Sequence, residues 1–174
     1  SANTTAGFSV VTWTQPNATN STVGHGLGVA PAFVVVKCRG ASSNWGVYHS
    51  ALGGTKYLWL NTTDAAGTAT SVWNDTAPTS SVFSMGTYWN GSYTYVAYCF
   101  AAISGYSAFG SYTGNTSSDG PFVYCGFRPR YVLLKASTLV VSWLVFDTSR
   151  SPYNVTGTYL LPNLSNAESG PGVG

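Results

Sequence analysis

The chain has 174 residues, of which 44% are hydrophobic and 15% aromatic, enough apolar material for one large domain or two small, closely packed units. Only 7% of the residues are charged, against about a quarter in a typical globular protein, and the formal net charge is +2. Its seven Lys and Arg side chains form no run, so no nucleic-acid partner is expected, and no apolar stretch approaches the roughly 20 residues needed for membrane insertion.

The first half of the chain predicts a series of short strands. Residues 7–14 read GFSVVTWT, and residues 32–37 read AFVVVK, a β-branched run that suits a strand buried on both faces. In NWGVYHS, at 44–50, the side chains alternate with a period of two, which is typical of a half-buried strand. YLWLNTTDA, at 57–65, and three more apolar segments within 70–103 continue the series. No stretch has the 3.6-residue periodicity of an amphipathic helix.

The second half of the chain repeats much of the first half. Trp45 and Trp143 stand in the matching motifs NWGVYHS and SWLVFDT, 98 residues apart. GVAPAFVVVK parallels GFRPRYVLLK, with Pro31 facing Pro129, and YLWLNTTDA parallels YLLPNLSNA. GFSVVTWT likewise parallels GYSAFGSYT. Self-similarity in one order, at nearly one spacing, predicts a duplicated structural unit with these two tryptophans and two prolines as its anchors.

These patterns predict an all-β fold, a two-sheet β-sandwich built from an internal duplication with about a dozen strands. We expect a first β-repeat unit over 1–104 with extra strands at 70–103, a second, shortened unit over 105–168 packed on the first, and a tail or linker at 169–174. The second copy stops before the strands that complete the first. Either the chain is a truncation, or the extra strands serve both copies, or a neighbouring chain covers the open edge.

Residues with catalytic or metal-binding chemistry are sparse. The acidic side chains are Asp64, Asp75, Asp119, Asp147 and Glu168. No two of them stand close in the sequence, so a glycosidase pair would have to be assembled by folding, and we interpret them as turn and cap residues. The three cysteines, Cys38, Cys99 and Cys125, and the two histidines lack metal-ligand spacing, so neither a metal nor a cofactor is expected. A Cys99–Cys125 disulfide is possible.

One aromatic cluster lies outside the portion that is present twice. The stretch MGTYWNGSYTY, at 85–95, places Tyr88, Trp89 and Tyr93 around an Asn-Gly turn at Asn90. Aromatic side chains at a hairpin tip are badly placed for core packing, and flat rings with nearby amides suit sugar rings or a protein partner. We therefore predict a glycan- or partner-binding site at these four residues. The alternative is that they cover the end of the sandwich or a subunit contact.

Nine of the eleven asparagines begin an Asn-x-Ser/Thr triplet, where composition alone would give about three. They are Asn3, Asn17, Asn20, Asn61, Asn74, Asn90, Asn115, Asn154 and Asn163. If the chain passes a glycosylation machinery, these are N-glycan acceptors, and sugar would keep the weakly charged surface soluble. If the chain is made in a bacterium, the triplets are turn and strand-end chemistry. The matching positions of Asn61 and Asn163 in the two copies favour a structural role there.

Several blocks of the chain carry a resemblance to a known family. They are VGHGLGVAP, NWGVYHSALG, YLWLNTTDA, VWNDTAPTSSVFSMG, TYVAYCFA, GYSAFGSYTGN, DGPFVYCGFRPRYVLLK and DTSRSPYN. Over about residues 6–168 the chain resembles a repeat domain of tail-fibre and other virion-surface proteins of tailed, often marine, bacteriophages. The resemblance implies a β-rich module of an extracellular virion appendage. The family has no motif with a known chemical role, so no functional residues carry over.

Together these features predict a non-enzymatic structural and adhesive module of a virion surface fibre, located at the virion surface or outside the cell. Such a module would form a homo-oligomer or fibre assembly and bind or present to cell-surface glycans, with weak contacts strengthened by repetition. The alternative is a secreted, N-glycosylated subunit of an extracellular filament or surface layer, joined by strand addition. A third hypothesis is a polysaccharide-degrading enzyme.

Overall fold

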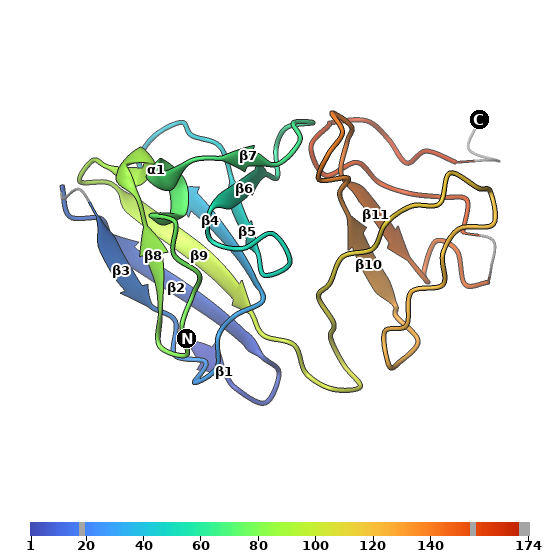
Figure 1. The fold of residues 1–174 in the computed structure, drawn as a ribbon, viewed down its shortest axis with the longest axis horizontal. Helices are drawn as coiled ribbons and strands as arrows, with labels where there is room; N and C mark the ends of the chain where they lie inside the picture. Colours follow the sequence, from blue (N-terminus) through green and yellow to red (C-terminus); the bar gives the residue numbers. More distant parts are fainter. Residues whose placement is uncertain (18–19, 154–155, 171–174) are drawn as a thin grey trace.

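The computed structural model describes residues 1–17, 20–153 and 156–170, and it confirms the all-β class. The strands are β1 (Ala2–Asn3), β2 (Phe8–Thr14), β3 (Ser21–Gly24), β4 (Phe33–Cys38), β5 (Gly46–His49), β6 (Lys56–Trp59), β7 (Gly67–Thr68), β8 (Val82–Met85), β9 (Thr94–Phe100), β10 (Tyr131–Leu134) and β11 (Leu144–Asp147). A short helix, α1 (Thr70–Trp73), precedes β8, and a 3-10 helix, η1 (Thr87–Trp89), follows it. Figure 1 shows two lobes side by side, an N-terminal lobe (residues 1–104) and a C-terminal lobe (residues 105–170).

Seven strands of the N-terminal lobe form one sheet in the order β1-β2-β9-β4-β5-β6-β7, in which all neighbours are antiparallel. β3 and β8 form a second antiparallel sheet that lies across one face of the first (Figure 1). β10 and β11 form a third antiparallel sheet in the C-terminal lobe. β9 pairs with β2 on one side and β4 on the other, so this expected strand lies at the centre of the large sheet, and β8 lies in the second sheet. The first of the three segments expected as strands within 70–103 forms α1 instead.

The main core lies between the large sheet and the β3–β8 sheet. Val34 and Val36 of β4, and Ala97 and Cys99 of β9, are 0% exposed because alternate side chains of each strand point to this inner face. Phe83 of β8 closes the core from the other sheet. β4, which contains most of the AFVVVK run, is buried on both faces, as its unbroken apolar sequence predicts.

Trp89 of η1 fills one end of this core. Its side chain is 1% exposed, and its ring centre lies 6.0 Å from that of Trp73 and 6.4 Å from that of Trp59. Its indole N–H donates a 2.9 Å hydrogen bond to the carbonyl of Val72. The ring packs directly on Gly46, where a Cβ atom would lie 2.5 Å from it. Gly46, at the start of β5, therefore leaves the space that the ring of Trp89 occupies.

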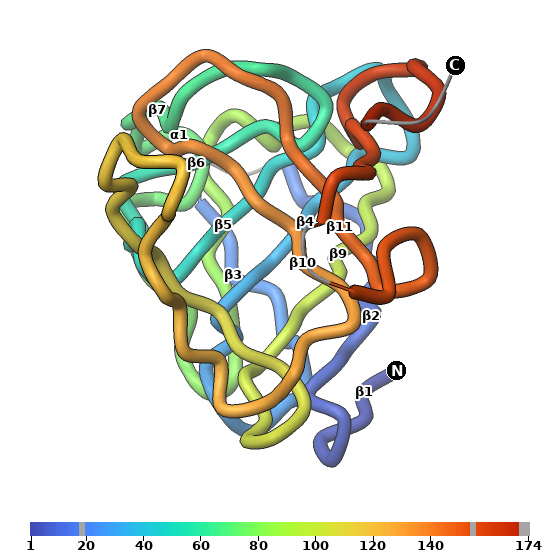
Figure 2. Tube along the Cα trace, turned by 90° about the vertical axis from the view of Figure 1, so that its right-hand side faces the viewer, coloured from blue at the N-terminus to red at the C-terminus, as the bar shows by residue number. Residues whose placement is uncertain are grey.

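The C-terminal lobe packs on the outer face of the large sheet. Trp143, which is 3% exposed, completes a second apolar cluster with Val35, Val47 and Leu58, one residue from each of three neighbouring strands. Its indole N–H donates a 2.9 Å hydrogen bond to the carbonyl of Trp59. Figure 2 looks through the C-terminal lobe onto this face. One tryptophan thus joins the two lobes by both apolar packing and a buried hydrogen bond.

Two polar links add to this junction. The backbone N–H of Ala66 donates to the carbonyl of Ser137 at 2.8 Å. The ammonium of Lys135 donates to the carbonyl of Thr63 at 3.2 Å. Burial lowers the pKa of Lys135, while the nearby carboxylate of Asp64 acts to raise it. The lobes are therefore held together at the β6–β7 edge as well as at the tryptophan.

The β10–β11 hairpin has the register of the β4–β5 hairpin. Val34 pairs with Tyr48, and the residues 98 positions later, Val132 and Phe146, pair in the same way. At this spacing, all four residue pairs between β10 and β11 correspond to the four pairs between β4 and β5. The matched Pro31, which is buried, and Pro129, which is partly exposed, each stand two positions before the first strand of their hairpin.

The matched asparagines make the same hydrogen bonds in both lobes. Oδ1 of Asn61 accepts the backbone N–H of Trp45 at 2.9 Å, and Oδ1 of Asn163 accepts the backbone N–H of Trp143 at 2.9 Å. Nδ2 of each amide then donates to the side chain of the residue before the tryptophan, at 3.0 and 3.2 Å. Each asparagine therefore fixes the entry to the second strand of its hairpin.

The correspondence ends where β2 would repeat. Residues 105–113 match β2 in sequence but form no strand, apart from the isolated bridge between Ile103 and Ser107. β2 is held by β9, and no described strand takes the place of β9 beside β10. A strand without a partner leaves its backbone groups unpaired, so this segment stays irregular. The extra strands of 70–103 pair only within the N-terminal lobe.

The cysteines differ sharply in burial. Cys38 and Cys99 are buried and Cys125 is partly exposed, and all three are free thiols, so the possible Cys99–Cys125 disulfide is not formed. Burial raises the pKa of Cys99 to about 12. Because the thiolate is the reactive form, this thiol is protected both by its pKa and by lack of access.

We expect Ellman's reagent at pH 8 to modify Cys125 within minutes, and to modify Cys38 and Cys99 only after urea unfolds the chain. The Cys125→Ser variant should lose the fast phase and keep the slow one. Fast modification of two or three thiols in the folded protein would contradict the burial of β4 and β9.

Candidate functional site

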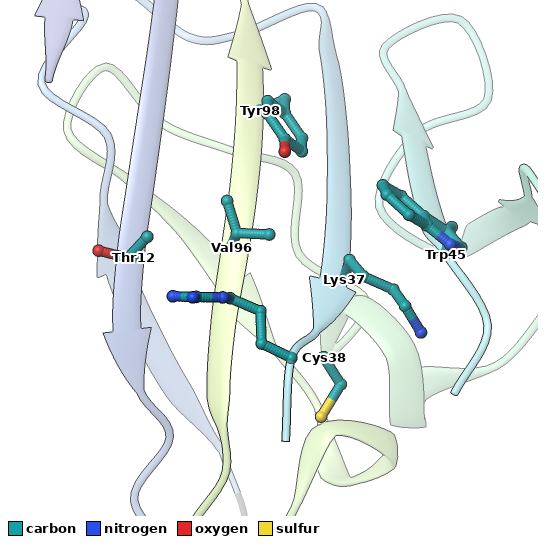
Figure 3. A pocket seen from close by; sticks show the side chains of 7 residues that line it. Thr12, Lys37, Cys38, Trp45, Val96 and Tyr98 are labelled. Carbon is teal, nitrogen blue, oxygen red and sulfur yellow. The ribbon is translucent and has the colours of Figure 1, made fainter. Parts of the chain in front are cut away.

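The part of the outer sheet face that the C-terminal lobe leaves open forms a hollow with a volume of about 580 Å³. We call it the outer-face pocket. It is lined by Thr12, Lys37, Cys38, Arg39, Trp45, Val96 and Tyr98. Figure 3 shows Thr12 on β2, Val96 and Tyr98 on β9, and Lys37 and Cys38 on β4, with Trp45 beyond Lys37 at the right. Three rigid strands therefore position most of the lining.

Alternation along β9 explains why this face is aromatic and polar. Tyr95 and Ala97 point into the main core, and Val96 and Tyr98 point to the opposite face. At the far end of the face, Phe109 stacks on Phe33 with ring centres 6.0 Å apart, so that end is covered. The open part is the remaining patch around Tyr98.

Lys37 and Trp45 form a fixed pair at one side of the outer-face pocket. The ammonium of Lys37 donates a 2.6 Å hydrogen bond to the carbonyl of Ser43 and lies 5.8 Å from the centre of the Trp45 ring. The backbone of Arg39 is held by a 2.7 Å hydrogen bond from its N–H to the carbonyl of Thr94. Two cations beside aromatic rings suit a flat ligand that carries negative charge.

The predicted aromatic site lies at a second hollow, of about 240 Å³, which we call the end pocket. It is lined by Cys38, Ala41, Ser42, Ser43, Tyr88, Trp89, Asn90, Tyr93 and Tyr95. The structure thus brings Tyr88, Asn90 and Tyr93 together, as expected. Tyr88 and Tyr93 are 40% and 44% exposed. Trp89 is different, because its side chain is buried in the core although the residue also lines the pocket.

The burial of Trp89 corrects the expectation that all the aromatic side chains near this turn are free for a ligand. η1 turns Trp89 inward, and Gly46 on β5, 43 residues away in the sequence, leaves room for its ring. The hydroxyl of Tyr95 donates a 2.9 Å hydrogen bond to the carbonyl of Trp89, which fixes the turn. Burial raises the pKa of Tyr95, and its interaction with Cys38 raises it further.

The triplet asparagines are mostly at the surface. Asn3, Asn17, Asn20, Asn61, Asn90 and Asn115 are exposed, Asn74 and Asn163 are partly buried, and Asn154 lies outside the described residues. Nδ2 of Asn61, Asn115 and Asn163 donates a hydrogen bond within the fold. A glycan on any of these three would replace that bond, which supports the structural interpretation at these positions.

Two acidic side chains meet at one arginine in the C-terminal lobe. Asp147 forms an ion pair with Arg150, and Nε of Arg150 lies 2.6 Å from a carboxylate oxygen of Glu168. Desolvation acts to raise the pKa of Asp147, but the backbone N–H groups of Arg150 and Ser149 and the Arg150 guanidinium together lower it. A lowered pKa suits a permanent ion pair, whereas a general acid needs a raised one.

No three His, Cys, Asp or Glu side chains gather in residues 1–17, 20–153 and 156–170 as a metal ion would require. Within the same ranges, the helices are too short and too polar to pass through a bilayer. The outer-face pocket and the end pocket therefore remain the surfaces with binding chemistry that we consider.

Comparison with known proteins returns a family profile, described as Domain of unknown function (DUF7483), which matches residues 1–173. No curated protein and no solved structure matches the chain. The profile covers both lobes, so the N-terminal and C-terminal lobes occur together as one family domain. It assigns no chemical role to any residue.

Proposed function

We propose that this chain, which belongs to the DUF7483 family, is a non-enzymatic structural and adhesive module of a virion surface fibre that binds cell-surface glycans. The observation that carries the proposal is the outer-face pocket, where Trp45 and Tyr98 stand beside Lys37 and Arg39 on a rigid sheet. Flat rings with neighbouring cations suit anionic sugars. The low charge content and the resemblance to tail-fibre repeat domains support a place on the outside of a virion.

The proposed architecture is a two-sheet sandwich unit over residues 1–104, a second, shortened copy over 105–168, and a tail beyond it. The common register of the two hairpins supports an internal duplication. The equivalent hydrogen bonds of Asn61 and Asn163 support it independently. Repetition suits a fibre, because several weak glycan contacts along one assembly act together, and a homo-oligomer would multiply them again.

Substitution of the pocket aromatics tests the glycan part of the proposal. We expect Tyr98→Ala and Trp45→Ala to weaken binding to immobilised acidic bacterial polysaccharide at least tenfold, because each loses one stacking face. Surface plasmon resonance at low salt would measure this. Tyr124→Ala is the matched control, since its ring is 83% exposed in the C-terminal lobe, away from the pocket, and should bind as the parent does.

Circular dichroism of each variant shows whether the fold is retained. Equal binding by the parent and both pocket variants would contradict the assignment of the outer-face pocket. Absence of binding to any acidic or neutral polysaccharide would contradict the adhesive role altogether.

A further inference from the structure

The strand β10 has one free edge. In the N-terminal lobe, β4 lies between β5 and β9, whereas β10, which has the register of β4, pairs only with β11 among the described strands. The N–H of Thr148 donates to the carbonyl of Arg130 at 3.0 Å, which places Arg130 among the residues bonded toward β11. Because backbone bonds alternate sides along a strand, the N–H and C=O groups of Tyr131, Leu133 and Lys135 face the free edge.

The inner-face side chains of β10 are less buried than the matched side chains of β4. Val34 and Val36 are 0% exposed, whereas the matched Val132 and Leu134 are only partly buried. Of the fourteen exposed large apolar side chains in the described residues, eleven lie in this lobe. In the N-terminal lobe, β9 and the β3–β8 sheet provide this cover. The C-terminal lobe therefore presents half of the same core, open on the side where β9 would lie.

We infer that the free edge of β10 accepts a strand with the pattern of β9 that is supplied from outside residues 1–174. On β4, the cysteine and alanine of β9 stand opposite Val34 and Val36. The same register on β10 would place small side chains opposite Val132 and Leu134 and would pair the free backbone groups. The chain's own β9 cannot do this, because both of its edges are already paired, with β2 and β4.

A second β10 fits this edge less well as the occupant. Antiparallel self-pairing centred on Leu133 would set Val132 opposite Leu134, two large side chains, where β9 places alanine and cysteine opposite the valines of β4. β9 reads TYVAYCF and carries no charge. An uncharged strand of alternating aromatic and small residues fits the edge better. This inference goes beyond glycan binding, because it names a polypeptide strand as a ligand. Its test is independent of the outer-face pocket.

A labelled peptide with the sequence of residues 92–102, carrying serine in place of the cysteine, tests the inference. We expect saturable binding to the 174-residue chain by fluorescence anisotropy. Tyr131→Pro should weaken it at least tenfold, because proline removes the N–H at the start of the edge. Proline is tolerated as the first residue of a strand, so β10 should still form. Tyr131→Val, which keeps the N–H, is the control and should bind as the parent does.

Amide hydrogen exchange locates the bound peptide. In the free chain, the amides of Tyr131 and Leu133 should exchange fast, and those of Val132 and Leu134 slowly, since only the latter two are paired with β11. The peptide should slow the first two. Absence of saturable binding, binding that Tyr131→Pro leaves unchanged, or protection confined to the N-terminal lobe would each overturn the inference. Self-association of the free chain that Tyr131→Pro abolishes would overturn it as well, because a second copy would then occupy the edge.

Discussion

Replacement of Trp89 with alanine is expected to lower the free energy of unfolding by about 3–5 kcal/mol. The ring is 1% exposed, and its loss would leave a cavity between the two sheets of the N-terminal lobe. It would also leave the carbonyl of Val72 without the donor that now bonds it at 2.9 Å. Urea unfolding followed by far-ultraviolet circular dichroism measures the change.

The neighbouring Tyr88→Ala is the matched control for this substitution. Tyr88 lies in the same 3-10 helix but is 40% exposed, so its removal should cost about 1 kcal/mol or less. Similar losses for the two variants would contradict the inward orientation of Trp89. Glycan binding measured on Tyr88→Ala also reports on the end pocket, which Trp89→Ala cannot do because it disturbs the core.

Replacement of Trp143 with alanine is expected to separate the lobes, at a cost of about 3–5 kcal/mol. The substitution removes the contact with Val35, Val47 and Leu58 and leaves the carbonyl of Trp59 buried without its donor. Limited proteolysis should then cut residues 105–130 faster, while circular dichroism still shows a folded N-terminal lobe. Thermal unfolding of the variant should show two transitions instead of one.

Trp45→Ala is the corresponding change 98 positions earlier, at the matched position of the N-terminal lobe. Trp45 is only partly buried and packs at the margin of the same apolar cluster, so we expect a loss of about 1–2 kcal/mol and no change in proteolysis between the lobes. If Trp45→Ala released the C-terminal lobe and Trp143→Ala did not, the described junction would be wrong.

The sequence predicts the class of this fold well because the signals are local. Unbroken and alternating apolar runs follow from which faces of a strand are buried, and β4 is buried on both faces as expected. β5 was expected to be half-buried but is buried on both faces, because Trp143 of the C-terminal lobe covers Val47 on the outer face. The parallel between GFSVVTWT and GYSAFGSYT predicts a strand at residues 105–113, but none forms there. A strand also needs a neighbour, and among the described strands β9 has no counterpart beside this segment. Pairing of that kind depends on distant residues and leaves no trace in the segment itself.

The position of Trp89 could have been inferred from a distant residue. Gly46 stands 98 positions before Leu144, the matching residue of the β10–β11 hairpin, and a glycine in a strand often marks the close approach of another group. His25, in the stretch GHGLG, also depends on distant residues. It is 1% exposed, with Nε2 3.1 Å from the carbonyl of Thr79 and Nδ1 accepting the N–H of Leu27, so it holds the loop from inside the fold. Its main partner lies 54 residues away.

The pairing of Phe8 with Phe100 has a mechanical consequence. Both residues lie at the same end of the β2–β9 ladder, and the chain enters β2 and leaves β9 there. Tension applied between residue 1 and residue 104 would therefore peel the two strands apart one rung at a time, instead of shearing all their hydrogen bonds at once. The N-terminal lobe should therefore unfold at low force in this direction. A force applied between other attachment points should have to be much larger to unfold it.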